Sequence, residues 1–205
     1  MKNISKMLFS LSVFALSACS FGGSPDVPNE KNMSKEEITA AWEKSMELAE
    51  EHKILSEMTG SWKASVKFWT QPGSAPNVSV AKSINKTILN GKFLVEDYSG
   101  SFGGQAFKGM SVMGYDTILQ KFSNFWADNM GTGAIYSEGT IDKANRSINF
   151  TGAATDPITK TKKPTFSVIK VIDNDRHTLE MFDVLPDGKK FKTLEIDYKR
   201  SVTKE

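Results

Sequence analysis

From Ser61 onward, apolar and polar residues alternate with a period of two. The stretch SWKASVKFW shows the pattern first, because Trp62, Ala64 and Val66 alternate with lysines and serines. Successive side chains of a β-strand point to opposite faces, so this alternation is typical of strands with one buried face. The pattern recurs near residues 79–89, 92–99, 106–115, 120–129, 133–141, 146–153, 164–173, 176–184 and 190–201. It predicts an all-β domain of about ten short strands.

Short segments with glycine or proline separate these stretches. Asn90-Gly91 and Asp187-Gly188 suit tight hairpins because their residues tolerate positive φ. No helical crossover intervenes, so consecutive strands are expected to pair as antiparallel neighbours. An antiparallel meander of this length removes its edges most simply by closing into a barrel. The lumen of a barrel with about eight to ten strands is either filled by side chains or holds one small ligand.

A helical pattern precedes the strands. Ser34 and Glu37 have the spacing of a capping box, and Ile38, Trp42 and Met46 then recur at helical intervals. The pattern predicts one amphipathic helix over residues 34–57, followed by a barrel domain over 58–205. A helix with an apolar face needs a surface to cover it, so this helix is expected to flank the barrel or to dock a protein partner.

The N-terminus has the layout of a secretory signal. Lys2 and Lys6 precede the apolar run MLFSLSVFAL, which is too short to span a bilayer. The next residues, LSAC, resemble the bacterial lipobox, in which cleavage leaves a lipidated N-terminal cysteine. We expect residues 1–18 to be a signal peptide, Cys19 to carry the lipid, and residues 19–33 to form a flexible tether. An ordinary signal peptide with an incidental cysteine is the alternative.

Ser20 indicates the location of the protein in the cell, and the charge balance indicates which class of partner is not expected. A serine after the cysteine resembles the signal for export to the outer membrane, so the expected location is the bacterial cell envelope, lipid-anchored and facing the periplasm. The chain has 26 basic and 24 acidic residues, and loss of Lys2 and Lys6 leaves 24 of each. A formally neutral domain has no field that attracts nucleic acid, so no nucleic-acid partner is expected.

Several segments together resemble a known family. They are HKILSEMTGSW (52–62), LNGKFLVEDYSG (89–100), WADNMGTG (126–133), DNDRHTLEM (173–181) and PDGKKFKTLEIDYKR (186–200). In this order they resemble a bacterial family known only as domain of unknown function 1579. The resemblance covers about residues 50–200 and implies a calycin-like barrel, related in shape to lipocalins, with Trp62 plugging one end. The family has no assigned reaction, so the resemblance implies a fold and not a function.

The stretch FWADNMGTG contains the strongest candidate site. Trp126 and Asp128 fall on one face of a strand that runs into a glycine-rich turn. If that face is inward, they combine an aromatic wall with a polar group, as small-molecule pockets do. The alternative is that Asp128 or Asn129 only bonds backbone amides of the turn.

Glu96 is a second candidate, on the same strand face as Tyr98. A carboxyl on an apolar face needs a partner or a raised pKa, and any of the three arginines, Arg146, Arg176 and Arg200, is a possible partner. The opposite facing would put Glu96 in solvent, and a period of two does not distinguish the two facings.

His177 alternates with Leu179 and Met181 and is the third candidate. The chain has two histidines and one cysteine, so neither a metal site nor a cofactor is predicted. No Gly-x-Ser-x-Gly motif or other catalytic constellation is present, and no catalytic residue is assigned.

The sequence favours a binding or accessory protein that holds a small apolar or amphipathic molecule in its barrel. Trp126 and Tyr98 would line the cavity, while Asp128, Glu96 and His177 would orient a polar head group. One alternative is an interaction module with a filled barrel that docks a partner through the helix 34–57. A hydrolase or isomerase that uses His177 is the other.

Overall fold

The computed structural model describes residues 33–185 and 187–201 of the 205-residue chain. The signal peptide predicted over 1–18, the lipidation of Cys19 and nearly all of the tether over 19–33 lie outside these residues. The elements are α1 (Lys35–Ser45), α2 (His52–Glu57), β1 (Gly60–Phe68), β2 (Asn77–Ile88), β3 (Phe93–Phe102), β4 (Gln105–Asp116), β5 (Lys121–Asp128), β6 (Ala134–Asp142), β7 (Ser147–Thr155), β8 (Lys162–Asp173), β9 (Arg176–Val184) and β10 (Lys190–Arg200).

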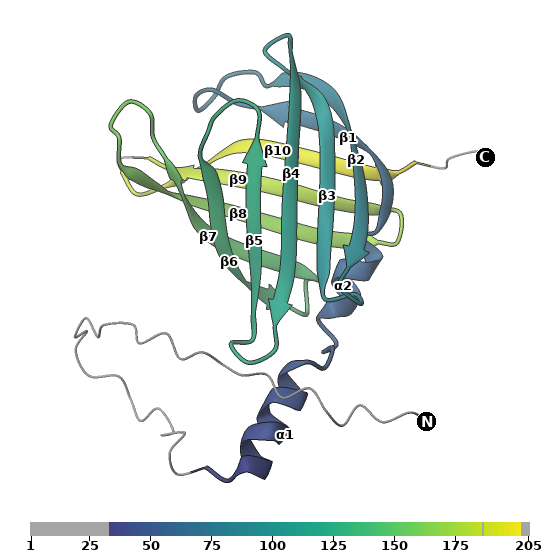
Figure 1. Cartoon of the computed structure of the whole chain (residues 1–205). Coiled ribbons are helices and arrows are strands. Elements are labelled where there is room, and N and C mark those ends of the chain that lie inside the picture. Colours follow the sequence, from purple (N-terminus) through teal and green to yellow (C-terminus); the bar gives the residue numbers. More distant parts are fainter. Residues whose placement is uncertain (1–32, 186, 202–205) are drawn as a thin grey trace. The chain divides into compact units, whose positions relative to one another are not determined.

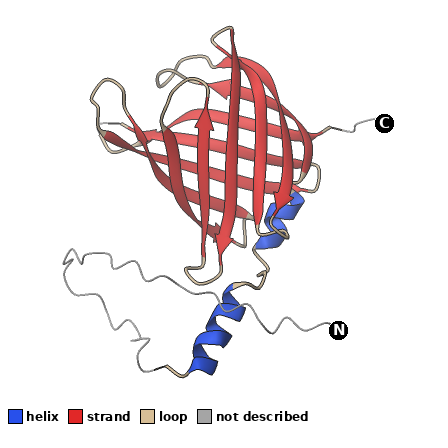
Figure 2. Cartoon of the chain, viewed as in Figure 1, coloured by secondary structure: helices blue, strands red, loops and turns tan. Residues whose placement is uncertain are grey.

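The ten strands form one closed antiparallel barrel (Figure 1, Figure 2). Strands adjacent in the chain pair with each other, and β1 pairs with β10 to close the sheet. Closure leaves no free edge, which is the constraint that a long meander has to satisfy. The predicted class, an all-β antiparallel barrel of about ten strands, is confirmed.

The connections divide between the two ends of the barrel. The helix end holds α2 and the turns that follow β2, β4, β6 and β8, while the far end holds the loops that follow the odd-numbered strands up to β9. In the turn after β2, Asn90 and Gly91 have φ values of 61° and 84°. These positive values are what an Asn-Gly sequence accommodates with little strain, so this predicted hairpin turn is confirmed.

The helical stretch consists of two short helices and not of the single helix predicted over 34–57. The capping box is present, because the Ser34 amide donates to the Glu37 carboxylate at 2.8 Å and the Glu37 amide donates to Ser34 Oγ at 3.2 Å. Between the helices, the Ala49 amide donates to His52 Nδ1 at 3.0 Å instead of continuing a helical ladder. Neither helix in the described residues has the length and apolar character needed to cross a bilayer.

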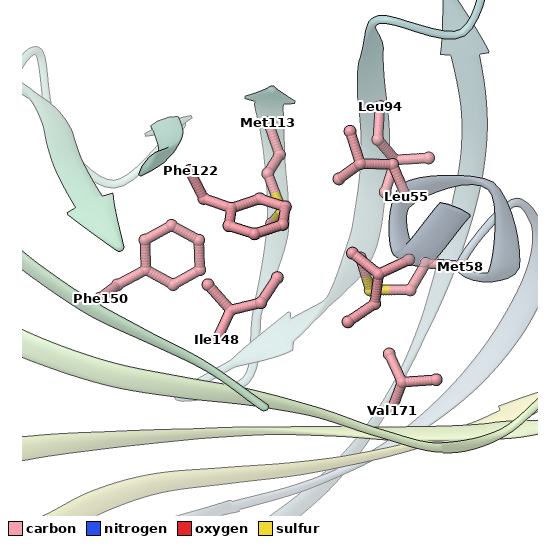
Figure 3. Packing of buried hydrophobic residues seen from close by; sticks show 9 residues of the cluster. Leu55, Met58, Leu94, Met113, Phe122, Ile148, Phe150 and Val171 are labelled. Atoms are coloured by element: carbon pink, nitrogen blue, oxygen red, sulfur yellow. The ribbon is translucent and has the colours of Figure 1, made fainter. Parts of the chain in front are cut away.

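α2 fills the helix end of the barrel with apolar side chains. Figure 3 shows Leu55 and Met58 pointing towards side chains from the surrounding strands. The cluster consists of Ile54, Leu55, Met58, Leu94, Met113, Phe122, Ile148, Phe150 and Val171, all buried. α2 is therefore part of the barrel core rather than a separable lid.

Trp62 and Arg200 close the same end. Trp62 is 2% exposed, and its Nε1 donates to the Met58 carbonyl at 2.9 Å. The Arg200 guanidinium lies 4.2 Å from the centre of the Trp62 ring and donates to the Thr59 carbonyl at 2.6 Å and to the Glu57 carbonyl at 3.0 Å. A cation over an aromatic face that also satisfies carbonyls after a helix stabilises this closure. Trp62 has the plugging role that the resemblance implied.

Replacing Leu55 with alanine tests the plug. Leu55 is fully buried, so Leu55→Ala should lower the free energy of unfolding by about 2–5 kcal/mol through lost burial and a residual cavity. Leu48→Ala is the matched control, because Leu48 is 53% exposed and its loss should change stability by less than about 1 kcal/mol. Urea denaturation measures both, and equal effects would contradict the plug.

Candidate functional site

Strand register determines which side chains point into the lumen. Trp62 pairs with Ser83, Ser83 with Tyr98, and Tyr98 with Gly109, which pairs with Asp128. Residues directly opposite each other in a sheet share a face, so Tyr98 and Asp128 lie on the same inward face as the buried Trp62.

The other three predicted residues face inward by the same argument. Glu96 pairs with Ser111, and Ser111 pairs with Trp126, one row closer to the helix end. His177 pairs with Tyr198 on the opposite side of the barrel. The structure thus brings all five predicted residues to the lumen wall, and it excludes the facing in which Glu96 lies in outer solvent.

Glu96 belongs to a chain of hydrogen bonds that ends at α2. Ser83 Oγ lies 2.8 Å from Glu96 Oε1 and also within hydrogen-bond distance of Asn85 Oδ1. Asn85 Nδ2 donates to the Met58 carbonyl at 3.0 Å, so the amide oxygen is the atom turned towards Ser83. Ser83 Oγ donates to Glu96 Oε1, so the carboxyl of Glu96 accepts one short hydrogen bond from β2.

The electrostatics of the site disfavour the ionised form of Glu96. Burial raises the pKa of Glu96, and hydrogen bonds from Ser83, Tyr198 and Ser111 oppose this rise. Two of those bonds are long, 3.4 Å from Tyr198 Oη and 3.5 Å from Ser111 Oγ. The hydrogen-bonding capacity of the carboxyl is therefore only partly used.

None of the three arginines considered as partners forms an ion pair with Glu96. Each arginine forms an ion pair elsewhere: Arg146 with Glu57, Arg176 with Asp197, and Arg200 with Asp175. Arg200 is held at the helix end by Trp62, and the other two side chains are about half exposed on the outer surface. Within the described residues, Glu96 takes part in no ion pair. Because it is buried without a cation, its pKa is raised instead.

The lumen holds a sealed cluster at the helix end and a second cluster, with less completely buried side chains, towards the far end. Leu55, Phe122 and Ile148 at the helix end are fully buried. Inward side chains nearer the far end are half-buried, namely Val66, Phe107, Trp126, Ile135, Ser167, Leu179, Met181 and Leu194. Glu96 lies deep among protein atoms but is likewise half-buried rather than sealed.

Three aromatic rings pack against one another on the lumen wall near Glu96. Tyr98 makes edge contacts with Phe107 and Trp126 at centroid distances of 5.8 Å and 6.1 Å. Phe107 stacks on Trp126 at 6.3 Å. Gly109 makes room for the Trp126 ring, because a Cβ at this position would overlap it. The result is a rigid aromatic wall on one side of the lumen.

Asp128 holds this wall in place. Its Oδ2 accepts a hydrogen bond from Trp126 Nε1 at 2.8 Å, and its Oδ1 accepts one from the Met130 amide at 2.9 Å. Asp128 therefore faces the lumen and also accepts a hydrogen bond from a backbone amide of the turn, so both interpretations of the sequence describe it. Asn129 instead joins β4, accepting from the Lys108 amide at 2.8 Å and donating to the Ala106 carbonyl at 3.0 Å.

His177 lies between two rings on the other side of the lumen. It is 4% exposed, stacks on Tyr198 at 4.3 Å and makes an edge contact with Trp62 at 4.4 Å. Burial, helped by the positive charge of Arg200, lowers the pKa of His177 to about 4. Its Nδ1 is buried and has no hydrogen-bond partner, as is also true of Asn124 Oδ1.

In the described part of the chain, no hydrogen bond joins His177 to a serine or to Glu96, so no nucleophile and base are assembled. Nor do three His, Cys, Asp or Glu side chains gather there as a metal site requires. What remains is a set of neutral hydroxyl and amide groups beside an aromatic wall.

Sequence reasoning missed several residues of this site. Ser83 and Asn85 alternate with Lys82, Ile84 and Lys86 in β2, so polar residues occupy the inward face of that strand. This alternation is readable in the sequence and pointed to a polar lumen. The role of Tyr198, which reaches Glu96 across the lumen, depends on barrel closure and leaves no local signal.

The pH dependence of stability tests the environment of His177. The pKa falls from 6.5 to about 4 on folding, so the unfolded chain binds the proton more readily between these values. Stability should therefore be lost as pH falls through this window, by on the order of 3 kcal/mol. His177→Phe should remove this component, as measured by urea denaturation between pH 4 and pH 7. An unchanged difference between the two proteins across that range would contradict the buried, neutral imidazole.

The chain resembles solved structures at the level of the fold. The crystal structure of Rv2717c from M. tuberculosis is 14% identical, with 76% of this chain and 99% of that chain covered and a TM-score of 0.55. A redesigned β-barrel, b11L5F_LGL, is 9% identical, with 72% of this chain and 95% of that chain covered, but its TM-score of 0.38 is too low to carry an argument. No curated protein matches the chain significantly.

The family comparison agrees with the resemblance noted in the sequence. The model of the family described as "Protein of unknown function (DUF1579)" matches residues 47–200, which include α2 and all ten strands of the barrel. With its closed ten-stranded barrel and the plug that the match includes, this chain belongs to the DUF1579 family.

Proposed function

We propose that this protein is a non-catalytic binding protein that holds one small apolar or amphipathic molecule in the far half of its barrel. The observation that carries the proposal is the contrast between the two halves of the lumen. Inward side chains at the helix end are sealed, whereas several towards the far end, such as Trp126, Phe107 and Leu179, are half-buried beside the buried Tyr98 and Ile196. Apolar walls with a few polar groups at their base are typical of small-molecule sites.

The walls of this half of the lumen determine which molecules fit. Trp126 and Phe107 form a flat aromatic surface, and Leu179, Leu194 and Met181 give the opposite wall an apolar, adaptable lining. An apolar tail against these walls is stabilised by about 25 cal/mol for each Å² that it removes from water. The polar groups around Glu96 then meet the head of the molecule.

Catalysis by His177 is less well supported. The imidazole lies between Trp62 and Tyr198, and its pKa of about 4 makes it a weak base at neutral pH. A hydrolase or isomerase would also need a nucleophile or acid in contact with it.

The same proposal includes a place in the cell. The charged start, the apolar run of MLFSLSVFAL and the LSAC sequence favour a lipid on Cys19. Residues 19–33 would then tether the barrel to the outer membrane on its periplasmic side, where the barrel meets amphipathic molecules from the envelope.

Native mass spectrometry of the chain from Ser20 onward, before and after extraction with organic solvent, tests the binding function. The proposal expects an added mass that extraction removes, and binding of the neutral dye Nile red by the extracted protein. Trp126→Ala should weaken dye binding about tenfold, which corresponds to about 1.4 kcal/mol of lost contact. Phe125→Ala is the matched control, since Phe125 is the next residue but faces outward and is 41% exposed. A bare mass together with no dye binding would contradict the proposal.

Docking of a protein partner is a second candidate function, and the exposure of apolar side chains favours it. Met46 and Leu48, in the segment that follows α1, are 56% and 53% exposed. Large exposed apolar side chains close together in the chain are typical of interaction sites.

Deletion of residues 33–48 tests this second function. The deletion has to stop before His52, because α2 fills the barrel and its removal would unfold the core. The shortened protein should keep the melting temperature of the barrel and lose capture of envelope proteins in a crosslinking experiment. Unchanged capture would contradict a docking role for this segment.

A further inference from the structure

The polar side chains that contact Glu96 in the lumen are uncharged. Glu96 is surrounded by the hydroxyls of Ser83, Ser111 and Tyr198, and Asn85 connects this polar layer to α2. Asn124 adds an amide on the neighbouring strand β5, where it pairs with Met113. No lysine or arginine of the described residues forms an ion pair with Glu96.

Two features of this layer indicate that it is incomplete. The hydroxyls of Tyr198 and Ser111 approach Glu96 only to 3.4 Å and 3.5 Å, which leaves much of its hydrogen-bonding capacity free. Asn124 Oδ1 is an acceptor with no donor. Asn124 lies in the row of Met113, and the last torsion of an asparagine side chain is broad, so a donor that reaches this row needs only a small turn of the amide.

Building on the proposed function, we infer that the barrel selects molecules with an uncharged hydroxyl head group and excludes carboxylates such as fatty acids. An alcohol both donates and accepts, so it can donate to Asn124 or to Glu96 and accept from Ser111 or from the protonated carboxyl. Its apolar tail then extends past Trp126 and Phe107 towards the far end.

A carboxylate has no comparable place in this lumen. It accepts hydrogen bonds but donates none, so it leaves the Asn124 oxygen without a partner. It would also be buried without a cation, beside another carboxyl, which is unfavourable because desolvation of the charge is not compensated. The fixed position of Arg200 at the plugged end prevents this side chain from supplying the missing charge.

A series of ligands that differ only in their head group tests the inference. The extracted chain from Ser20 onward is titrated at pH 7 with 1-decanol, decanoate and decylammonium, with displacement of Nile red and calorimetry as readouts. Decanol should bind at least about tenfold more tightly than either ion. Equal binding of decanol and decanoate, or tighter binding of either ion, would overturn the inference while leaving the proposed function intact. Failure of all three to bind would overturn both.

The variant Glu96→Gln tests whether the Glu96 carboxyl is uncharged when a ligand binds. Glutamine is also neutral and has both a donor and an acceptor, so decanol affinity should stay within about threefold and decanoate should still bind weakly. A marked gain in decanoate affinity would mean that a negative charge on Glu96 had repelled it, which would contradict the uncharged layer.

Asn124→Leu distinguishes a binding group from a structural one. Leucine has nearly the shape of asparagine and leaves no acceptor without a partner, so the variant should melt at a higher temperature while binding decanol several-fold less tightly. A lower melting temperature with unchanged decanol affinity would mean that Asn124 serves the fold alone, and the assignment of the head-group site would fail.

Discussion

The carbonyl of Met58 connects the plug, the barrel wall and the polar layer. It accepts hydrogen bonds from Trp62 Nε1 at 2.9 Å and from Asn85 Nδ2 at 3.0 Å, so the end of α2 is bonded to both β1 and β2. Asn85 also contacts Ser83, and Ser83 donates to Glu96. One backbone oxygen thereby anchors a series of polar contacts that runs from the plug to the centre of the lumen. Arg200 stabilises the same corner from the last strand by covering Trp62.

This connection explains why the barrel has two unlike halves. The helix end is filled by side chains from α2 and the strands and contributes stability in the way of an ordinary hydrophobic core. The other half has half-buried apolar walls and a buried carboxyl that lacks a cation, an arrangement that stability alone does not favour. Proteins commonly accept such costs where a site has to be ready for a ligand. The proposed binding function gives the polar layer a reason to exist.

Much of the fold was readable from the sequence, whereas the site was readable only in part. The alternation that starts at Trp62 and the Asn90-Gly91 turn are local signals, and both the strands and this hairpin form as predicted. The inward facing of Glu96 depends on register, because a period of two allows either face. The break between α1 and α2 depends on one side-chain bond from the Ala49 amide to His52, which helical periodicity does not reveal. The contact of Tyr198 with Glu96 joins strands far apart in sequence and exists only because the barrel closes.

The protonation of Glu96 is the central claim of this account, and nuclear magnetic resonance tests it most directly. Protein labelled with carbon-13 at the glutamate carboxyl is titrated with acid, and the Glu96 signal is assigned by its loss in Glu96→Gln. The Glu96 carboxyl carbon is expected to titrate above pH 4.5, the ordinary pKa of a glutamate. A Glu96 signal that titrates at or below this value would contradict the buried, uncharged carboxyl and the polar layer built around it.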